Sequence, residues 1–220
     1  MKNILNKIER EKITDELLLN LIKTNEKIYI DDFTNIIIAQ EIGLNTQKPI
    51  KQTLRGDKIT HTLKRHGKDS NMVKYGGQIP TDLEDIKNYV DIVNNANLYS
   101  IKFSNGTGKI LLSGVQINGF YVVAESVCTN KNELKFISYY KENGTLARNK
   151  DFDGKHSGVR VLTPDGRPYS PKSSLGVKLD SSPRSNENIS QQNLKNAESD
   201  NVDNLSINAS ESHKYRKDKQ

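Results

Sequence analysis

The sequence predicts an α+β fold in which N-terminal helices pack on a four-stranded antiparallel sheet and a disordered C-terminal tail follows. Apolar residues change from helical spacing to a period of two near Leu98, and four alternating segments then follow at short intervals. Strands joined by short turns are antiparallel neighbours, so we expect a meander. Helices first and strands afterwards is the order typical of an α+β domain.

Composition divides the chain into three parts. Hydrophobic residues make up 34% of the 220 residues, which is low for a chain that is globular throughout. We expect a helical N-terminal extension over 1–27, a folded domain over 28–148, and a loop-rich to disordered basic tail over 149–220. From about Ser170 the chain is rich in Asn, Ser and Gln, and such a composition buries too little apolar surface to fold.

Charge, cysteine content and hydropathy restrict the partners and the location. A formal net charge of +6 favours an acidic partner without identifying it. The single cysteine, Cys128, excludes an intramolecular disulfide and a cysteine-based zinc site, and its alternating apolar surroundings favour a small buried hydrophobe over a nucleophile. The sequence has no apolar run of about 18 residues and no signal-peptide core at its N-terminus, so we expect a soluble protein.

The first 45 residues show helical spacing. Thr14 is a suitable N-cap, and the leucine and isoleucine residues that follow it recur at helical intervals. A second helical segment is expected over 31–42, although Ile36–Ile38 is equally compatible with a short strand. Gly43 is a natural end to a helix.

The segment Ile59–Gly67 carries two histidines and two fixed cations, Lys64 and Arg65. On a helix, His61 and Arg65 share a face because they are four residues apart, while His66 lies about 100° further round. Imidazole takes and gives a proton near neutral pH, and guanidinium offers a fork of donors that suits phosphate. The segment therefore favours phosphodiester chemistry.

Ordinary helix capping is the competing interpretation of the same segment. Cations in a last turn suit the helix dipole, and a glycine after the helix, here Gly67, adopts a left-handed conformation cheaply. Capping does not account for His61, which we place in the first turn, where the dipole disfavours a cation. Spacing alone does not separate the two interpretations.

The residues after the histidine segment predict a loop and then a helix. Gly76 and Gly77 bring backbone amides close to a ligand or simply form a turn, which is the commoner role. Thr81–Glu84 has the pattern of a capping box, and apolar residues at helical spacing follow it, so a helix is predicted over Asp82–Val93.

Four strands are predicted beyond this helix. They span Leu98–Phe103, Lys109–Gln116, Phe120–Cys128 and Glu133–Lys141. Asn118-Gly119 is a type I′ hairpin signal, and Asn105-Gly106 and Thr129–Lys131 suit the other turns.

The last predicted strand places two hydroxyl groups on one face. Strict alternation puts Leu134, Phe136, Ser138 and Tyr140 on the same side. We expect the apolar end in the core and the hydroxyl end at the rim, near the histidine helix. The competing interpretation is that Tyr140 is an edge aromatic and Ser138 a filler.

The order of these signals resembles the phage-associated Barnase, EndoU, colicin and RelE-like nucleases, which occur in phage head-morphogenesis (MuF-type) and mobile-element proteins. The resemblance covers about 90 residues, from Lys51 to Lys141. It is carried by Ile59-x-His61-x-x-x-Arg65-His66-Gly67, by the segment from Gly77-Gln78 to Asp85-Ile86, by Ile117-Asn-Gly-x-Tyr-Val-Val123, and by Leu134-x-x-x-Ser138-x-Tyr140.

The resemblance implies a barnase/RelE-like fold and metal-independent endoribonuclease chemistry without a cofactor, in which the RNA 2′-hydroxyl attacks phosphorus and leaves a cyclic phosphate. It makes His61 the leading acid or base, with His66 as its partner. The resemblance also implies that Arg65 neutralises the charge of the phosphorane oxygens. Ser138 or Tyr140 would orient the phosphate or transfer a proton. Lys64 and Gln78 would bind the substrate, and Gln78 is also a candidate base. The histidine segment has no carboxylate to serve as the base.

The resemblance further implies a toxin or effector of a phage or mobile element, with tRNA or mRNA as target and a cognate immunity protein as partner. Its location would be cytoplasmic in the producing or target bacterium, or virion-associated. Two other functions compete with this one. The first is a catalytically inactive module that binds RNA or protein, and the second is a structural morphogenesis subunit, which the absence of coiled-coil heptads does not favour.

Overall fold

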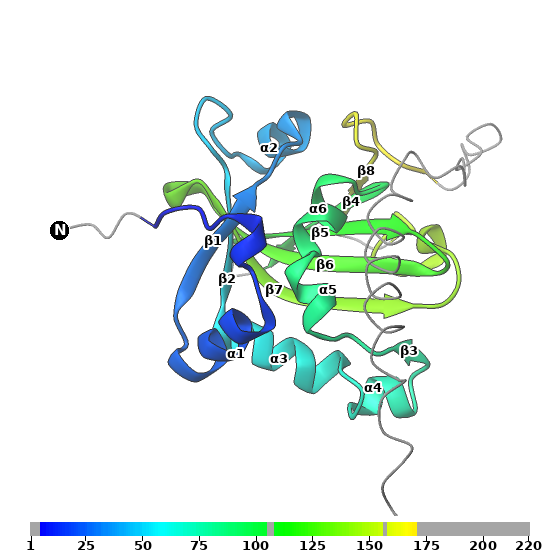
Figure 1. The fold of residues 1–220 in the computed structure, drawn as a ribbon. Coiled ribbons are helices and arrows are strands. Elements are labelled where there is room, and N and C mark those ends of the chain that lie inside the picture. Colours follow the sequence, from blue (N-terminus) through cyan, green and yellow to red (C-terminus); the bar gives the residue numbers. More distant parts are fainter. Residues whose placement is uncertain (1–4, 105–107, 156–157, 171–220) are drawn as a thin grey trace, which may run out of the picture. The chain divides into compact units, whose positions relative to one another are not determined.

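The computed structural model of the protein describes residues 5–104, 108–155 and 158–170. They form helices around an eight-stranded, mainly antiparallel sheet (Figure 1). The strands are β1 (Lys27–Asp32), β2 (Lys51–Arg55), β3 (Gln78–Ile79), β4 (Leu98–Ser104), β5 (Gly108–Gln116), β6 (Phe120–Cys128), β7 (Glu133–Glu142) and β8 (Val159–Leu162). The helices are α1 (Asp15–Thr24), α2 (Ile36–Ile42), α3 (Gly56–His66), α4 (Asn71–Lys74), α5 (Leu83–Lys87) and α6 (Tyr89–Asn94), with 3₁₀ turns η1 (Arg10–Lys12), η2 (Thr129–Lys131) and η3 (Leu146–Arg148).

The expected α+β class is confirmed, but the prediction of a four-stranded sheet is wrong. The four predicted strands are present as β4 to β7 and form the expected antiparallel meander. The sheet order is β1-β2-β7-β6-β5-β4-β8, and β3 also pairs with β7. The pairing of β2 with β7 is parallel. Sequence patterns missed β1 and β2 because each is short and β2 is polar, so neither shows a clear alternation.

Two of the three predicted turns lie within the described residues. Asn118 and Gly119 have φ angles of 42° and 112°, and both are positive as a type I′ turn requires. Residues 129–131 form η2, which connects β6 to β7. The predicted turn at Asn105-Gly106 lies outside the described residues.

The first N-terminal helix begins where the sequence indicates, but the helix expected over 31–42 begins only at Ile36, because residues 31 and 32 belong to β1. The side chain of Thr14 accepts a hydrogen bond from the Leu17 amide, so its predicted role as the N-cap of α1 is confirmed. Residues 36–38 are helical, and Asn35 caps the helix that they begin. Gly43 ends α2 in a left-handed conformation with a φ of 84°.

The helix predicted over Asp82–Val93 is two short helices that meet at Asn88. The predicted capping box at Thr81–Glu84 is wrong by one residue. Asp82 is the N-cap of α5, and its side chain and that of Asp85 bond reciprocally to each other's backbone amides. Asp85 also accepts a hydrogen bond of 2.7 Å from the Lys141 ammonium, which fixes α5 to β7.

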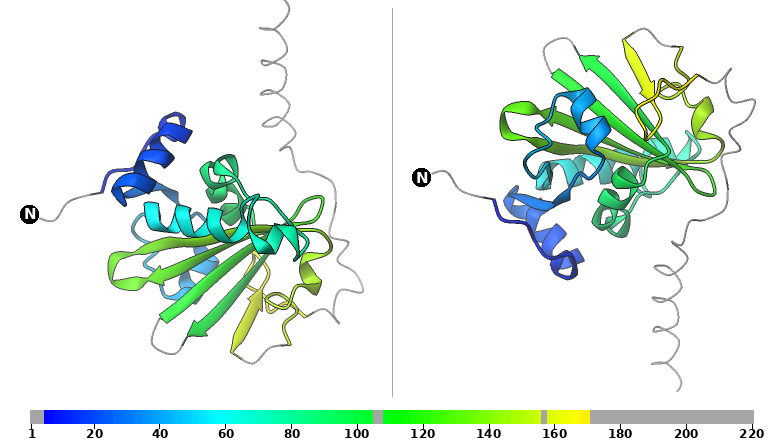
Figure 2. Two further views of the ribbon diagram at one scale, coloured as in Figure 1. Left: turned by 90° about the horizontal axis from the view of Figure 1, so that it is seen from below. Right: turned by 90° about the horizontal axis from the view of Figure 1, so that it is seen from above.

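Two apolar clusters cover opposite faces of the sheet. The larger cluster joins α1, α2, α3, α5 and α6 to the sheet, and Figure 2 shows α1, α3 and α5 on the same side. The smaller cluster lies between the strands, η3 and the segment that carries Phe152. Residues 149–170, expected to be loop-rich, include β8, which pairs with β4. Residues 171–220, expected to be disordered, lie outside the described residues.

A β-bulge in β7 changes which side chains share a face. The register with β6 shifts between Phe136 and Ser138, so Ile137 is an extra residue. Phe136 and Tyr139 therefore belong to the larger cluster, whereas Tyr140 packs against the smaller one. The expectation that Tyr140 shares a face with Phe136 is wrong, because strict alternation does not survive the inserted residue.

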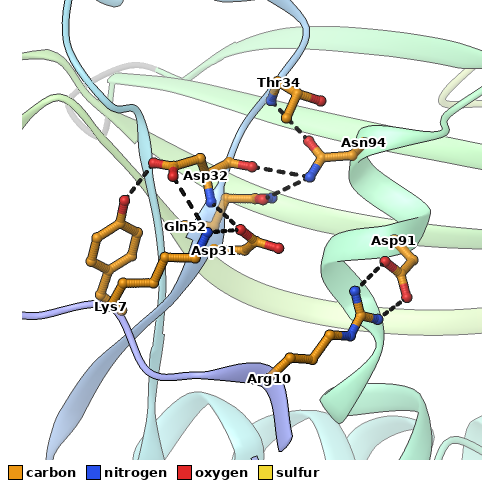
Figure 3. A network of polar contacts seen from close by, with 9 residues as sticks. Lys7, Arg10, Asp31, Asp32, Thr34, Gln52, Asp91 and Asn94 are labelled. Carbon is orange, nitrogen blue, oxygen red and sulfur yellow. Dashed lines mark hydrogen bonds and ion pairs between the residues drawn. The ribbon is translucent and has the colours of Figure 1, made fainter.

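Polar contacts attach the N-terminal segment to the sheet and to α6 (Figure 3). Lys7 forms an ion pair with Asp31, and Arg10 holds both carboxylate oxygens of Asp91. Asn94 on α6 donates to the Asp32 carbonyl oxygen. Among the described residues, no helix is both long and apolar enough to cross a membrane.

A carboxyl group is buried on the side of the sheet that carries the larger cluster. Glu125 is completely buried, and one of its oxygens accepts a hydrogen bond of 3.3 Å from the Gln52 side-chain amide. Its second oxygen has no hydrogen-bond partner among the described residues. Burial raises the pKa of Glu125 to about 8, and the Gln52 hydrogen bond opposes this only in part. The group is therefore neutral at pH 7.

We expect Glu125 to make folding less favourable as the pH rises. Its pKa is higher in the folded state than in the unfolded state, so the stabilisation is complete below about 4.5 and is lost as the pH rises toward 8. The slope should approach about 1.4 kcal/mol per pH unit. Urea unfolding of the wild type and Glu125→Gln over this pH window measures it. The variant should lack this pH dependence and be the more stable protein at pH 8. Parallel curves of unfolding free energy against pH for the two proteins would show that Glu125 is already charged in the folded state.

Gly56 allows α1 and α3 to approach closely. A Cβ atom at this position would overlap the carbonyl oxygen of Leu21 on α1. Gly→Ala in an open helix stabilises by about 1 kcal/mol, but here we expect Gly56→Ala to destabilise by about 1–3 kcal/mol. Chemical denaturation tests this, with Lys64→Ala at an exposed position of the same helix as the control, expected to change stability by less than about 0.5 kcal/mol. A more stable Gly56→Ala protein would show that the two helices do not need this approach.

Candidate active site

The site is built where α3 ends beside β7. α3 begins directly after β2 and packs along β7, so its C-terminal turn reaches the far end of that strand. The Thr81 amide donates a hydrogen bond of 2.8 Å to the carbonyl oxygen of His66, which attaches the last residue of α3 to the start of α5. Short β3 then pairs with β7 and places Gln78 directly opposite Glu142.

Three side chains form a hydrogen-bonded chain at this edge. The ring nitrogen Nδ1 of His66 lies 2.7 Å from Oε1 of Gln78, and Nε2 of Gln78 donates to Oε1 of Glu142, also at 2.7 Å. The carboxylate only accepts hydrogen bonds, so it requires the amide NH₂ of Gln78 to point toward it. The amide oxygen then faces His66, whose Nδ1 must carry the proton. Nε2 of His66 is left with the free lone pair.

Tyr140 completes the surroundings of His66. The two rings stack with centroids 5.6 Å apart and an interplanar angle of 29°. Burial, followed by the negative charges of Asp151 and Glu142, raises the pKa of the Tyr140 hydroxyl above its ordinary value of 10. Tyr140 is therefore protonated at neutral pH and is not a base.

The imidazole of His66 is held in its neutral form. Its residue is only 5% exposed, and this burial is the largest cause of a pKa below the ordinary 6.5. The neighbouring Arg65 and His61 side chains lower the pKa further, whereas the Gln78 hydrogen bond and the Glu142 charge raise it. A neutral imidazole with a free lone pair can accept a proton at pH 7.

The structure brings together three of the seven candidate residues predicted from the sequence, namely His66, Gln78 and Tyr140. His61, Lys64 and Arg65 lie on the exposed side of α3. Ser138 lies on β7, and its hydroxyl is buried without a hydrogen-bond partner among the described residues. Gln78 is buried as well, and both ends of its amide are occupied.

Two details of the histidine segment differ from expectation. α3 begins at Gly56, so His61 lies in the second turn, and the dipole argument that set it apart from capping does not apply. Gly67 is extended, with φ −75° and ψ 173°, and not left-handed. A glycine is still required there, because a Cβ atom would overlap the carbonyl oxygen of Leu63.

Sequence reasoning missed Glu142, the carboxylate at the end of the hydrogen-bonded chain. The predicted strand stopped at Lys141, one residue short of the end of β7. Tyr140 and Glu142 are two residues apart and face the same side, so extending the alternation by one step would have found it. Within the described part of the chain, no group of three or more His, Cys, Asp or Glu side chains is placed to hold a metal ion.

Helices on one face of a mainly antiparallel sheet, with imidazole, amide and carboxylate groups at its edge, define an α+β domain with a candidate acid–base site. The chain belongs to the family described as phage-Barnase-EndoU-ColicinE5/D-RelE like nuclease3, whose model matches residues 28–149. The resemblance seen in the sequence is thereby confirmed. No curated protein and no solved structure matched the chain.

The charges around His66 predict how its titration responds to substitution. We expect its midpoint to lie below 6.5, to rise in Arg65→Gln because a neighbouring cation is removed, and to fall in Glu142→Gln because an anion is removed. Long-range ¹H–¹⁵N NMR over a pH series measures this, with His66→Gln used to assign the signal. Shifts of the opposite sign in the two variants would contradict the assigned surroundings.

Proposed function

We propose that the protein is a metal-independent endoribonuclease, a toxin or effector of a phage or mobile element, with tRNA or mRNA as its target and a cognate immunity protein as its inhibitor. The match to a nuclease family supports nuclease chemistry in general. The hydrogen-bonded chain from Glu142 through Gln78 to His66 is the observation that supports this mechanism.

In the proposed reaction, His66 is the general base. Its Nε2 takes the proton of the RNA 2′-hydroxyl, whose oxygen attacks the adjacent phosphorus. The bond from phosphorus to the 5′-oxygen breaks, the leaving oxygen takes a proton from the His61 imidazolium, and a 2′,3′-cyclic phosphate remains. Gln78 and Glu142 are positioning residues, because they hold the His66 ring and its tautomer and do not touch the RNA.

The exposed side of α3 supplies the positive charge that this reaction needs. Arg65 follows His61 by one helical turn and precedes His66 directly, so its position on α3 lies between those of the proposed acid and the proposed base. We propose that Arg65 neutralises the phosphorane oxygens as their charge increases, and that Lys64 and the Tyr140 hydroxyl hold the phosphate.

A catalytically inactive module that binds RNA or protein is the second candidate function. One observation favours it: His66 is only 5% exposed, which restricts the access of a substrate to its ring. The cationic side of α3 would still bind phosphates in such a module.

We expect RNA cleavage in EDTA to depend on both histidines. General acid or base catalysis contributes roughly 10²- to 10⁴-fold, so His61→Ala and His66→Asn should each lose activity in that range. His61 is exposed, and its substitution should change stability by less than about 0.5 kcal/mol. Cleavage of labelled RNA and thermal melting, measured on the same samples, separate the two effects.

The pH profile tests the positioning role. Glu142→Gln should move the acidic limb of the activity profile, where activity rises as His66 loses its proton, to lower pH, because the pKa of His66 falls when the carboxylate is removed. A purely structural loss would lower activity equally at every pH. RNA binding without cleavage by the wild type would support the binding module instead, and a requirement for added divalent metal would refute the metal-independent mechanism.

A further inference from the structure

A second cationic feature lies at the other end of α3 and takes no part in the chemistry proposed above. An open pocket of about 490 Å³ is formed where β1, β2, α3, η2 and β7 meet. It is lined by Lys27, Thr53, Arg55, Lys58, Lys131, Lys135 and Phe136.

The carboxylates beside this pocket neutralise only part of its charge. Glu133 is almost completely buried and pairs with Lys27 at 3.1 Å and with Lys135 at 3.5 Å. Asp57 pairs with Arg55 and Lys58. Five cations therefore face two carboxylates, an excess of three positive charges. Within the described part of the chain, Lys131 has no ion pair.

The buried Glu133 has a consequence for ligand binding. A carboxylate beneath two lysines holds their ammonium groups in place before a ligand arrives, so less side-chain entropy is lost on binding. Glu133 is the first residue of β7, and its strand register with Lys51 on β2 fixes it there. The sheet therefore fixes Glu133 and the lysines that it pairs with, while η2 contributes Lys131 to the pocket.

One face of α3 connects the pocket to the candidate active site. Lys58, His61 and Arg65 follow at intervals of three and four residues, so they lie along one side of the helix. Lys58 lines the pocket, and Arg65 lies beside His66, about 10 Å further along the helix axis. A single polyanion can lie along this side and contact both ends.

We propose that this pocket binds backbone phosphates of single-stranded RNA that flank the bond to be cleaved. The excess positive charge recognises a polyanion without regard to base sequence, and the volume is within the range of nucleotide-sized ligands. This proposal rests on the proposed function for the identity of the RNA, but it concerns binding and is tested without cleavage.

The test measures the affinity of the full chain for a fluorescein-labelled RNA dodecanucleotide by fluorescence anisotropy over a range of salt concentrations. All proteins carry His66→Asn, so that the RNA stays intact. The pocket variant adds Lys131→Gln and Lys135→Gln. We expect the affinity for RNA to fall by about tenfold at low salt. The slope of log K against log salt concentration, called the salt slope below, should decrease in magnitude by about 1.4, which is about 0.7 for each phosphate that the variant no longer neutralises.

Two matched controls separate the pocket from general electrostatics. Lys12→Gln with Lys23→Gln removes the same charge from exposed positions outside the pocket and should leave the slope unchanged. Lys131→Arg with Lys135→Arg keeps the charge and should restore binding. The single variant Lys131→Gln, at an exposed residue, should show about half the slope change without affecting melting.

The outcomes distinguish this proposal from the proposed function. Equal losses of RNA affinity in the pocket variant and in the Lys12/Lys23 control would overturn the proposal that the pocket binds RNA. Unchanged RNA affinity in the pocket variant would overturn it as well, and an acidic protein would then be the alternative partner of the pocket. Absence of cleavage in EDTA together with the expected slope change would refute the nuclease mechanism but support the pocket.

Discussion

The candidate site depends on the parallel pairing of β2 with β7. This pairing covers only Lys51–Thr53 and Glu133–Lys135, but it joins segments that are about 80 residues apart in the chain. Because α3 follows β2 without a loop, the pairing determines where α3 starts and along which strand it runs. The C-terminal turn of α3 then lies beside β3 and the end of β7, where His66 forms its hydrogen bond with Gln78. Misplacing this short pairing would separate His66 from Gln78 and Tyr140.

The side chains on the two faces of β7 make contacts of different kinds. On the side of the larger apolar cluster, Lys141 pairs with Asp85 and fixes α5 to the sheet. On the opposite side, the neighbouring Glu142 fixes Gln78 and thereby the His66 ring. Alternation along a strand thus gives two adjacent residues opposite roles, one in stability and one in the candidate site. The bulge at Ile137 sets which residues fall on which side.

Glutamine between a histidine and a carboxylate has a specific chemical consequence. A carboxylate in direct contact would stabilise the imidazolium and raise the pKa of the ring, whereas an amide transmits orientation with much less charge. Burial then keeps His66 neutral, the form that a base requires. In the proposed function, the cations on α3 and in the pocket beside Glu133 bind phosphate separately, on the exposed surface. Proton transfer and substrate attraction are therefore assigned to different groups.

The sequence by itself determined several local elements and three residues of the candidate site, His66, Gln78 and Tyr140. The meander from β4 to β7, the Thr14 cap, the turn at Asn118 and the family followed from periodicity and short motifs, because these depend on neighbours in the chain. Tertiary structure alone decided that His66 meets Gln78 and Glu142, that Tyr140 leaves the face of Phe136, and that five cations meet at one pocket. These features arise from a parallel pairing between distant segments and from one inserted residue, and neither leaves a periodic signal in the sequence.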